Sequence, residues 1–447
     1  MRYFPNSKES IKAMLDSVGV KSLEELFSSI PRSNLTKDKV YFGKSLSEPE
    51  LIDYFKKLES ENKIREYKIF LGGGSYYHFI PEVVNYLSQK GEFVTPYTPY
   101  QPEVSQGTLQ ATFEYQTMIS DLTGMEFSNA SLYDGATAAA EGLLLAWRVT
   151  RKNKFLIAKS LHPEYIETIK TYVKNLNIEL DYIEYDESGR VSSEDFNKKY
   201  GEEIGGVLIQ SPNFFGIIED YSWIKEKIGN NKTLLITVIA EALSLGILKP
   251  PADYGADVAV GEAQSFGLYP SFGGPSLGFI TTSNKKFLWE MPGRIVGETV
   301  DAEGNKGFVL TLSTREQHIR RERATSNICS NQAWCVIRAS IFLAAYGKRG
   351  LRELAKQNII KANYAKERLK ETGIRVRFNA PIFNEFIIEV NSSEDVYKKL
   401  LDKKIIAGIP LKWFYPEDET GLLLTFTEVN TEEEIEELVK ALEESND

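Results

Sequence analysis

Cysteine and histidine are scarce in this chain of 447 residues, and it has no long apolar run. Its two cysteines, Cys329 and Cys335, exclude a disulfide framework, and three histidines make a Cys/His zinc site unexpected. The most hydrophobic segment, residues 334–346, contains Arg338 and is shorter than the roughly 18 residues of a membrane-spanning helix. The start, MRYFPNSKES, lacks the apolar region of a secretory signal. We therefore expect a cytoplasmic protein with no metal site and no membrane partner.

Basic residues are too few to outweigh the acidic ones. The chain has 53 Lys and Arg against 63 Asp and Glu, a formal net charge of −10 and a pI near 5.3. Nucleic acids bind basic surfaces, so no nucleic-acid partner is expected. Hydrophobic residues make up 42% and charged residues 26%, which is ordinary globular usage and excludes a disordered or fibrous chain. At about 150 residues a domain, the length allows two or three domains.

Three stretches of different character divide the chain. Residues 1–70 predict a helical N-terminal arm, because apolar positions such as Met14 and Val18 recur at helical spacing. Residues 71–330 predict a large α/β domain, and residues 331–447 predict a smaller C-terminal α/β domain.

The large domain is predicted from an alternating pattern. Glycine and proline are dense between residues 70 and 130, which predicts ordered loop with short helices. From about residue 135, helical stretches alternate with short β-branched runs such as residues 154–158 and 233–239. Such alternation predicts a doubly wound, mostly parallel sheet that is covered on both faces.

The C-terminal third is predicted to begin with a long helix. An uninterrupted helical pattern runs from Arg315 to Tyr346 and is expected to end at Gly347. Strand-like runs, EFIIEV and GLLLTF, then alternate with helical stretches, and the chain closes with an acidic helix.

The loops after the predicted strands are candidate sites, because open α/β sheets bind ligands there. Residues 131–137 lead into an Ala-rich helix whose start could attract phosphate, although Asp134 would repel an anion and suits an ordinary N-cap. Residues 210–216 carry usual turn residues. Glu241 follows an apolar strand, where a carboxylate can hold a protonated heterocycle nitrogen or can simply face solvent.

Lysine is missing from a stretch in which it would matter. Between Lys249 and Lys285 the chain has none, and this stretch includes the loop at residues 261–266. Pyridoxal enzymes need a lysine to form their Schiff base. If this loop belongs to a pyridoxal-type fold, it cannot anchor the cofactor.

Several segments together resemble the glycine decarboxylase (P-protein) family of the glycine cleavage system, and more narrowly subunit 1 of the form split into two chains. The strings TPYTPYQPE and TREQHIRRERATSNIC are long and irregular, so they are far more specific than a lone Gly-rich loop. The resemblance extends from about residue 1 to beyond residue 440. The matching segments are residues 93–123, 129–141, 249–278, 291–300 and 314–330.

This resemblance implies a fold-type-I architecture, that of pyridoxal-phosphate-dependent transferases, in agreement with the α/β pattern. It implies an enzyme that decarboxylates glycine and passes the aminomethyl group to the lipoyl group of H-protein. In the split form the cofactor lysine belongs to the partner, subunit 2, which binds pyridoxal phosphate. Gln264 stands where the cofactor-bearing half would place that lysine, and Glu241 stands near the aspartate that faces the cofactor nitrogen. The chain would complete a shared site, in a complex of two copies of each chain.

Residues 95–106 form the segment that we expect to touch the chemistry. Pro96, Pro99 and Pro102 fix φ at every third position, so the loop is stiff. Its tyrosines, threonines and glutamines supply donors and acceptors without fixed charge, which suits a pocket that admits a zwitterion and then excludes water. The candidate catalytic residues are Thr95, Tyr97, Tyr100, Gln101, Gln106 and, after a run of three glycines, His78.

Other interpretations stay open at this point. His78 could donate a proton near the lipoyl sulfur or be a buried, satisfied histidine, and the tyrosines could simply pack at a subunit contact. The enzyme could instead be an independent pyridoxal enzyme that uses Lys249 or Lys285, or the chain could be a scaffold without catalysis. A basic cluster could form helix-surface ion pairs, orient the shared site or attract an acidic H-protein. It consists of Arg315, His318, Arg320, Arg321 and Arg323.

Overall fold

The computed structural model describes residues 6–35, 43–95, 98–229, 231–328 and 330–446. Contacts divide the chain into two compact units, Met1–Arg65 and Glu66–Asp447. The boundaries expected after residues 70 and 330 stay predictions.

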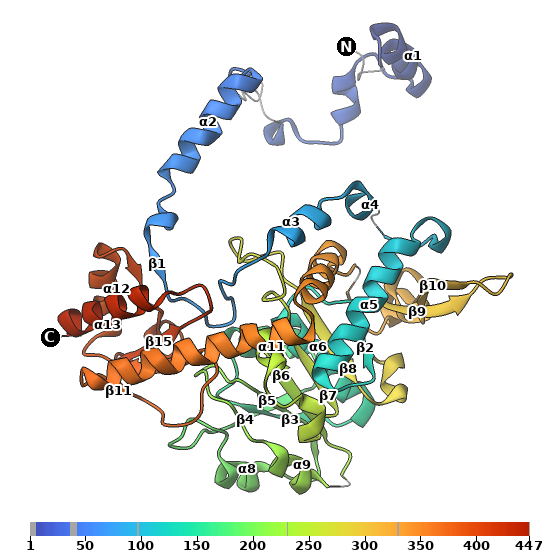
Figure 1. The fold of residues 1–447 in the computed structure, drawn as a ribbon. Coiled ribbons are helices and arrows are strands. Elements are labelled where there is room, and N and C mark those ends of the chain that lie inside the picture. Colours follow the sequence, from blue (N-terminus) through green and yellow to red (C-terminus); the bar gives the residue numbers. More distant parts are fainter. Residues whose placement is uncertain (1–5, 36–42, 96–97, 230, 329, 447) are drawn as a thin grey trace. The chain divides into compact units, whose positions relative to one another are not determined.

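The first unit is helical, as the sequence predicts. Helix α1 (Lys8–Val18) begins where the Ser7 hydroxyl accepts a hydrogen bond from the Ser10 N–H, and it ends at Gly19 with φ of 81°. Helix α2 (Glu48–Glu61) begins with a capping box between Ser47 and Glu50. Neither helix, both blue in Figure 1, has a buried residue. Apolar side chains such as Met14 on α1 and Phe55 on α2 are exposed.

The second unit is built on a seven-stranded sheet in the order β2-β8-β7-β6-β5-β3-β4. Five neighbouring strands are parallel, and β8 runs antiparallel to both of its neighbours, β7 and the edge strand β2. The strands are β2 (Phe127–Ser128), β3 (Lys154–Ala158), β4 (Glu179–Ile183), β5 (Ile204–Gln210), β6 (Leu234–Ile239), β7 (Val258–Glu262) and β8 (Gly278–Thr282). The predicted mostly parallel sheet is confirmed.

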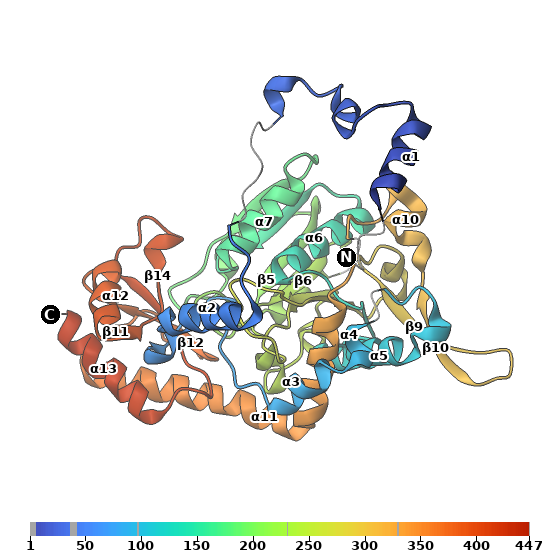
Figure 2. The same ribbon diagram turned by 90° about the horizontal axis from the view of Figure 1, so that it is seen from above.

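Helices cover both faces of this sheet. Along β5, Leu208 packs in the same cluster as α6 (Gly135–Thr150) and α7 (Pro163–Val173). Its neighbours Val207 and Ile209 face the other way, because side chains alternate along a strand. They pack with α8 (Ser193–Lys199) and α9 (Ser222–Ile228). Figure 2 shows α6 and α7 lying over the strands. The doubly wound arrangement is therefore confirmed.

A smaller antiparallel sheet lies in the C-terminal part, in the order β11-β12-β15-β14. Its strands are β11 (Arg375–Val376), β12 (Glu385–Glu389), β14 (Ile409–Pro410) and β15 (Gly421–Thr425), with α12 (Ser393–Asp402) and α13 (Glu432–Asn446) beside it. Strand β1 (Lys68–Ile69) pairs in parallel with β13 (Ile405–Ile406). Residues 66–80 therefore run from this part of the unit to the edge of the large sheet (Figure 1).

The predicted helix from Arg315 to Tyr346 is wrong in its first half, whereas its helical second half and its end at Gly347 are confirmed. Among the described residues between Arg315 and α11, only α10 (Gln317–Arg320) and the 3-10 turn Arg321–Arg323 form. Helix α11 spans Ala333–Glu371 and is non-helical at Gly347. The helical path ends at Arg321, whose φ of 55° is positive and not helical. Before it, the buried side chain of Arg315 donates hydrogen bonds to the backbone carbonyls of Met291, Gly293 and Leu312.

Two further elements differ from the expectation. Within the segment predicted to hold short helices, α3 (Glu82–Ser88) and α4 (Gly91–Val94) are short, but α5 (Gln106–Thr123) has 18 residues. A hairpin of β9 (Ile295–Val300) and β10 (Lys306–Thr311) was not foreseen. The hairpin packs on α5, where Leu109 shares a small core with Val296 and Phe308.

Candidate functional site

Buried polar side chains gather where the parallel strands end. His162 follows β3, Glu241 follows β6, and Glu262 and Gln264 lie at the end of β7 and just beyond it. Each is at most 4% exposed. Glu241 is thus not a surface side chain, the alternative that the sequence left open. Ligands bind at this edge in open α/β sheets, so it is the first candidate site.

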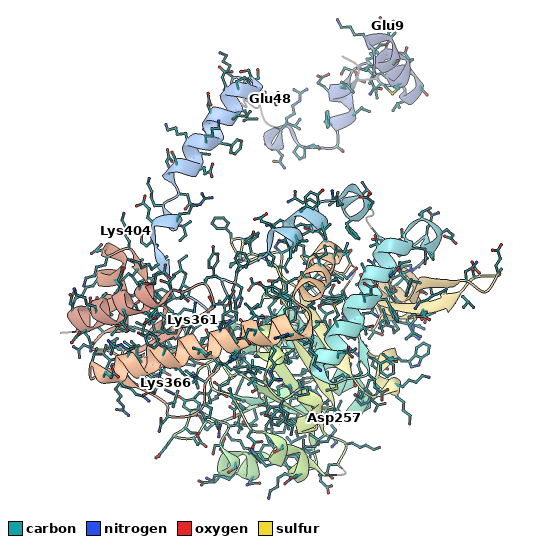
Figure 3. All side chains as sticks on the ribbon, viewed as in Figure 1. Glu9, Glu48, Asp257, Lys361, Lys366 and Lys404 are labelled. Atoms are coloured by element: carbon teal, nitrogen blue, oxygen red, sulfur yellow. The ribbon has the colours of Figure 1, made fainter. Side chains whose placement is uncertain are left out.

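His78 lies between two carboxylates. Its Nε2 is 3.1 Å from Oε2 of Glu241, and its Nδ1 is 2.8 Å from Oε2 of Glu428. Burial alone would lower the pKa of His78, but the two carboxylates outweigh it and raise the pKa to about 10. Lys361 on α11, labelled in Figure 3, donates to the backbone carbonyl of Glu428 and steadies the loop. The ring is therefore a buried cation with both nitrogens engaged.

Gln264 pairs with the backbone of Tyr76. Its Oε1 accepts the Tyr76 N–H at 2.9 Å, and its Nε2 donates to the Tyr76 carbonyl at 3.1 Å. The Tyr76 hydroxyl donates to Oε2 of Glu385 at 2.8 Å. Burial raises the pKa of the Glu385 carboxyl to about 7. The amide of Gln264 is thus fully occupied by the chain itself.

His162 and Glu385 hold Gly73 from two sides. The Gly73 N–H donates to Oε1 of Glu385 at 2.6 Å, and Nε2 of His162 donates to the Gly73 carbonyl at 2.6 Å. The imidazole stacks on Tyr165 with ring centroids 4.8 Å apart. Burial lowers the pKa of His162, so its ring is neutral.

Glu262 occupies the start of α6. Its Oε2 accepts the Gly135 N–H at 2.9 Å, and its Oε1 accepts the N–H groups of Gln264 and Leu277 at 2.9 and 2.8 Å. Burial raises the pKa of this carboxyl to about 7. Asp134 accepts the Thr137 N–H at 2.7 Å, so the capping interpretation of Asp134 is confirmed. Carboxylates therefore already satisfy N–H groups at this helix start.

The predicted loop at residues 95–106 forms a second cluster. Thr95 donates its hydroxyl hydrogen to the Gly91 carbonyl at 2.6 Å. Tyr100 is 54% exposed, and its ring lies edge-on to His318 with centroids 5.6 Å apart. Its hydroxyl accepts a hydrogen bond from buried Arg294. Tyr97 lies outside the described residues.

Both predicted glutamines of this loop flank a 3-10 turn, η4 (Pro102–Val104), and they differ in exposure. Gln101 precedes the turn and is exposed. Gln106 donates to the carbonyls of Pro102 and Phe308 and accepts the Phe308 N–H at 2.9 Å, so it pins the β9–β10 hairpin. His78 contacts the first cluster instead, so the structure divides the predicted residues between two places.

The residues of the predicted basic cluster lie in two different environments, one buried and one exposed. Arg315 is buried among backbone carbonyls, and burial lowers its pKa to about 10. Arg320, Arg321 and Arg323 are exposed. A small pocket beside Arg315 is lined by Arg294, by Glu316 and by Ser326. Arg315 thus supports the fold, and the exposed arginines remain available to a partner.

Sequence reasoning missed several members of these clusters. Glu428 and Glu385 stand in strand-like runs without any local mark of a site. Arg294 gave no signal beyond its place in a matching segment. Glu262 and His162 could have been found from their positions directly after predicted strands.

Comparison with known proteins decides the family. The profile of the family described as glycine cleavage system P-protein matches residues 1–442. The chain belongs to this family. A Koribacter versatilis relative, described as "Probable glycine dehydrogenase (decarboxylating) subunit 1", is 47% identical over 446 residues, which is 99% of this chain and 100% of the relative. A relative of the same description from Thermotoga maritima is 46% identical over 442 residues, covering 98% and 99%. The predicted P-protein resemblance and its subunit 1 enzyme type are confirmed.

Solved structures agree with membership of the P-protein family. The crystal structure of glycine decarboxylase (P-protein) of the glycine cleavage system, in inhibitor-bound form, matches with a TM-score of 0.88 and 42% identity over 100% of both chains. A sphingosine-1-phosphate lyase from Burkholderia pseudomallei, 12% identical, matches with a TM-score of 0.67 over 92% of this chain and 93% of that one. The second likeness concerns the fold alone. The predicted fold-type-I class of pyridoxal-phosphate-dependent enzymes is confirmed.

The residues at the strand ends do not fit the cofactor of this fold. A Schiff base needs a lysine, and Gln264 stands in a stretch without any. A phosphate needs free N–H groups at a helix start, and Glu262 already accepts that of Gly135. A pyridine nitrogen needs a free carboxylate, and Glu241 already faces His78.

Proposed function

We propose that this chain is the cofactor-free subunit of a two-chain glycine decarboxylase. Together with subunit 2 it would decarboxylate glycine, release CO2 and pass the aminomethyl group to the lipoyl group of H-protein. Subunit 2 would bind pyridoxal phosphate through its own lysine. The observation that carries this proposal is Gln264, whose side-chain amide is hydrogen-bonded to the Tyr76 backbone where a Schiff-base lysine is required.

The segment at residues 95–106 is the part that we propose to reach the shared site. Tyr100 is half exposed, so a second chain can contact it, and buried Arg294 orients its hydroxyl. The proposed set from this segment is Thr95, Tyr97, Tyr100, Gln101 and Gln106. His78 belongs to it only as a positioning residue, because carboxylates engage both of its ring nitrogens.

The enzyme alternative with a displaced lysine finds little support. Lys249 and Lys285 are exposed, and Nζ of Lys249 lies 4.5 Å from the ring centroid of Tyr254. The scaffold alternative differs from our proposal only in whether Tyr100 and its neighbours affect the rate of glycine decarboxylation.

Among the described residues, no helix is long and apolar enough to cross a membrane, and no group of His, Cys, Asp and Glu is placed to hold a metal. A cytoplasmic location stays a prediction.

Exchange of labelled bicarbonate into the glycine carboxyl group tests the proposal. The assay is run with lipoylated H-protein and pyridoxal phosphate on this chain alone, on subunit 2 alone and on the mixture. We expect exchange only in the mixture. Significant exchange by this chain alone would refute a cofactor-free role, and full exchange by subunit 2 alone would refute a shared site.

A further inference from the structure

Residues 72–78 lie against the buried strand-end cluster and contact almost all of its members. Gly73 is bonded to His162 and Glu385, Tyr76 to Gln264 and Glu385, and His78 to Glu241. We propose that this segment, called the plug, together with Glu262 permanently fills the pocket in which enzymes of this fold bind their cofactor. On this proposal the pocket is filled by the chain's own residues, and it is not a site that binds the cofactor weakly.

Backbone contacts show that the plug is seated closely. A Cβ atom added at Gly74 would lie 2.7 Å from Nε2 of His162, and Gly74 has φ of 101°, which favours glycine. An added Cβ at Gly72 would collide with Thr425 and Glu385. The run of three glycines is therefore what lets the main chain enter between the strand-end loops and the smaller sheet.

Side chains in the plug region occupy the positions of two charged groups that a cofactor would bring. His78 places a cation against Glu241, the position that suits a protonated heterocycle nitrogen. Glu262 places a carboxylate at the start of α6, the position that suits a phosphate. An added Cβ at Gly135 would lie 2.7 Å from Cβ of Glu262, so no room is left between them. The chain itself thus occupies both positions.

Displacement of the plug from the pocket is energetically unfavourable. Without it, the buried side chains of Gln264, Glu385 and His162 would lose the partners described above, and buried polar groups without partners are strongly disfavoured. This inference rests on the proposed function in one respect, namely that the working cofactor belongs to subunit 2.

Hydrogen exchange of the unmodified chain in complex with subunit 2 tests the plug directly. We expect the amides of Gly73, Tyr76, Gly135 and Gln264 to exchange at least ~100-fold more slowly than in an unstructured peptide. Adding pyridoxal phosphate should leave the exchange of residues 72–78 unchanged. Fast exchange in this segment, or new protection when the cofactor is added, would overturn the proposal.

Chemical trapping gives an independent test with variants of this chain in the same complex. The change Gln264→Lys introduces the missing amine but leaves the rest of the plug, whereas His78→Gly with Glu262→Gly and Gln264→Lys also removes its charged parts. After incubation with pyridoxal phosphate and borohydride reduction, mass mapping follows label at position 264. We expect at least ~10-fold more label there in the triple variant than in Gln264→Lys, and none in the control Gln264→Met.

Equal labelling of Gln264→Lys and the triple variant would overturn the plug, as would no labelling of the triple variant. Glycine–bicarbonate exchange by the lone unmodified chain would contradict the proposed function without bearing on these labelling ratios. The two proposals can therefore fail separately.

Discussion

Arg294 donates a hydrogen bond from Nη2 to the hydroxyl of Tyr100 at 3.0 Å, and the guanidinium carbon lies 5.2 Å from the centroid of the same ring. The arginine side chain is only 5% exposed and has Glu316 at 3.5 Å as its ion pair. A buried cation thus fixes the orientation of a half-exposed phenol. The Tyr100 hydroxyl is thus a polar group of the predicted loop with a defined orientation.

Tyr100→Phe should lower kcat by roughly 10-fold with the complex intact, because one oriented hydrogen bond worth ~1.4 kcal/mol in the transition state would be lost. Tyr86→Phe is the matched control. The Tyr86 hydroxyl also accepts from a cation, Lys90 at 2.7 Å, but it lies on the exposed face of α3. Unchanged turnover in Tyr100→Phe would favour plain packing of this ring.

Stability should depend on pH through His78. Its pKa is raised from 6.5 to about 10 on folding, so its contribution is fully present below about pH 6.5 and is lost as the pH rises through 10. Between these values the folded chain holds one more proton, and the free energy of unfolding should fall by up to ~1.4 kcal/mol per pH unit. Urea unfolding of the chain and of His78→Gln at several pH values measures this slope.

The variant His78→Gln should lose most of that slope, whereas His318→Gln, at a histidine side chain that is 48% exposed, should keep it. Equal slopes in the chain and in His78→Gln would show that the imidazole does not gain its proton on folding.

Arg315 should contribute to the stability of the folded chain, and Arg323 should not. Arg315→Ala removes hydrogen bonds to backbone carbonyls in a buried position, so we expect a loss of ~2–4 kcal/mol in the free energy of unfolding. Arg323→Ala, at an exposed site, should leave stability within about 0.5 kcal/mol. Thermal and urea unfolding compare the two, and equal losses would contradict the assignment of Arg315 to the fold.

Exposed arginines should instead affect the partner. If Arg321 and Arg323 attract an acidic H-protein, changing both to Ala should raise KM for H-protein several-fold and flatten its salt dependence. Lys227→Ala combined with Lys232→Ala, at two exposed lysines elsewhere, is a control that removes the same charge. An unchanged KM and salt dependence in the double variant would remove electrostatic attraction as the role of this cluster.

Apolar side chains on α2 should drive assembly. Leu51 and Phe55 are 45% and 59% exposed, and burying such side chains against subunit 2 is worth ~1.5–3 kcal/mol each. Changing both to Ser should weaken the complex at least ~100-fold in Kd by sedimentation, with the unfolding temperature of the isolated chain unchanged. Lys57→Ser on the same helix should leave assembly intact. The same sedimentation experiment measures the mass of the complex and so tests the predicted stoichiometry of two copies of each chain.

Local sequence patterns predicted the α/β core because each strand and helix there follows its own periodicity. The strand at residues 154–158 was predicted with its observed bounds. The break in the helix after Arg315 was not predictable, because it lies at the positive φ of Arg321, and an arginine gives no local signal for that conformation. The site was harder still: His78 and Glu428 are separated by 350 positions, and no local pattern reports such a contact.

The plug also joins two parts of the second unit that a hinge would have to separate. Just before the plug, β1 pairs with β13, and within it Gly73 and Tyr76 are bonded to Glu385 of the smaller sheet. Tyr76 is also bonded to Gln264, just beyond the end of β7 in the large sheet. A swing of one sheet against the other would break these bonds together, so we expect the two sheets to move as one body. If the proposed shared site is correct, we expect any closing motion around glycine to come from subunit 2.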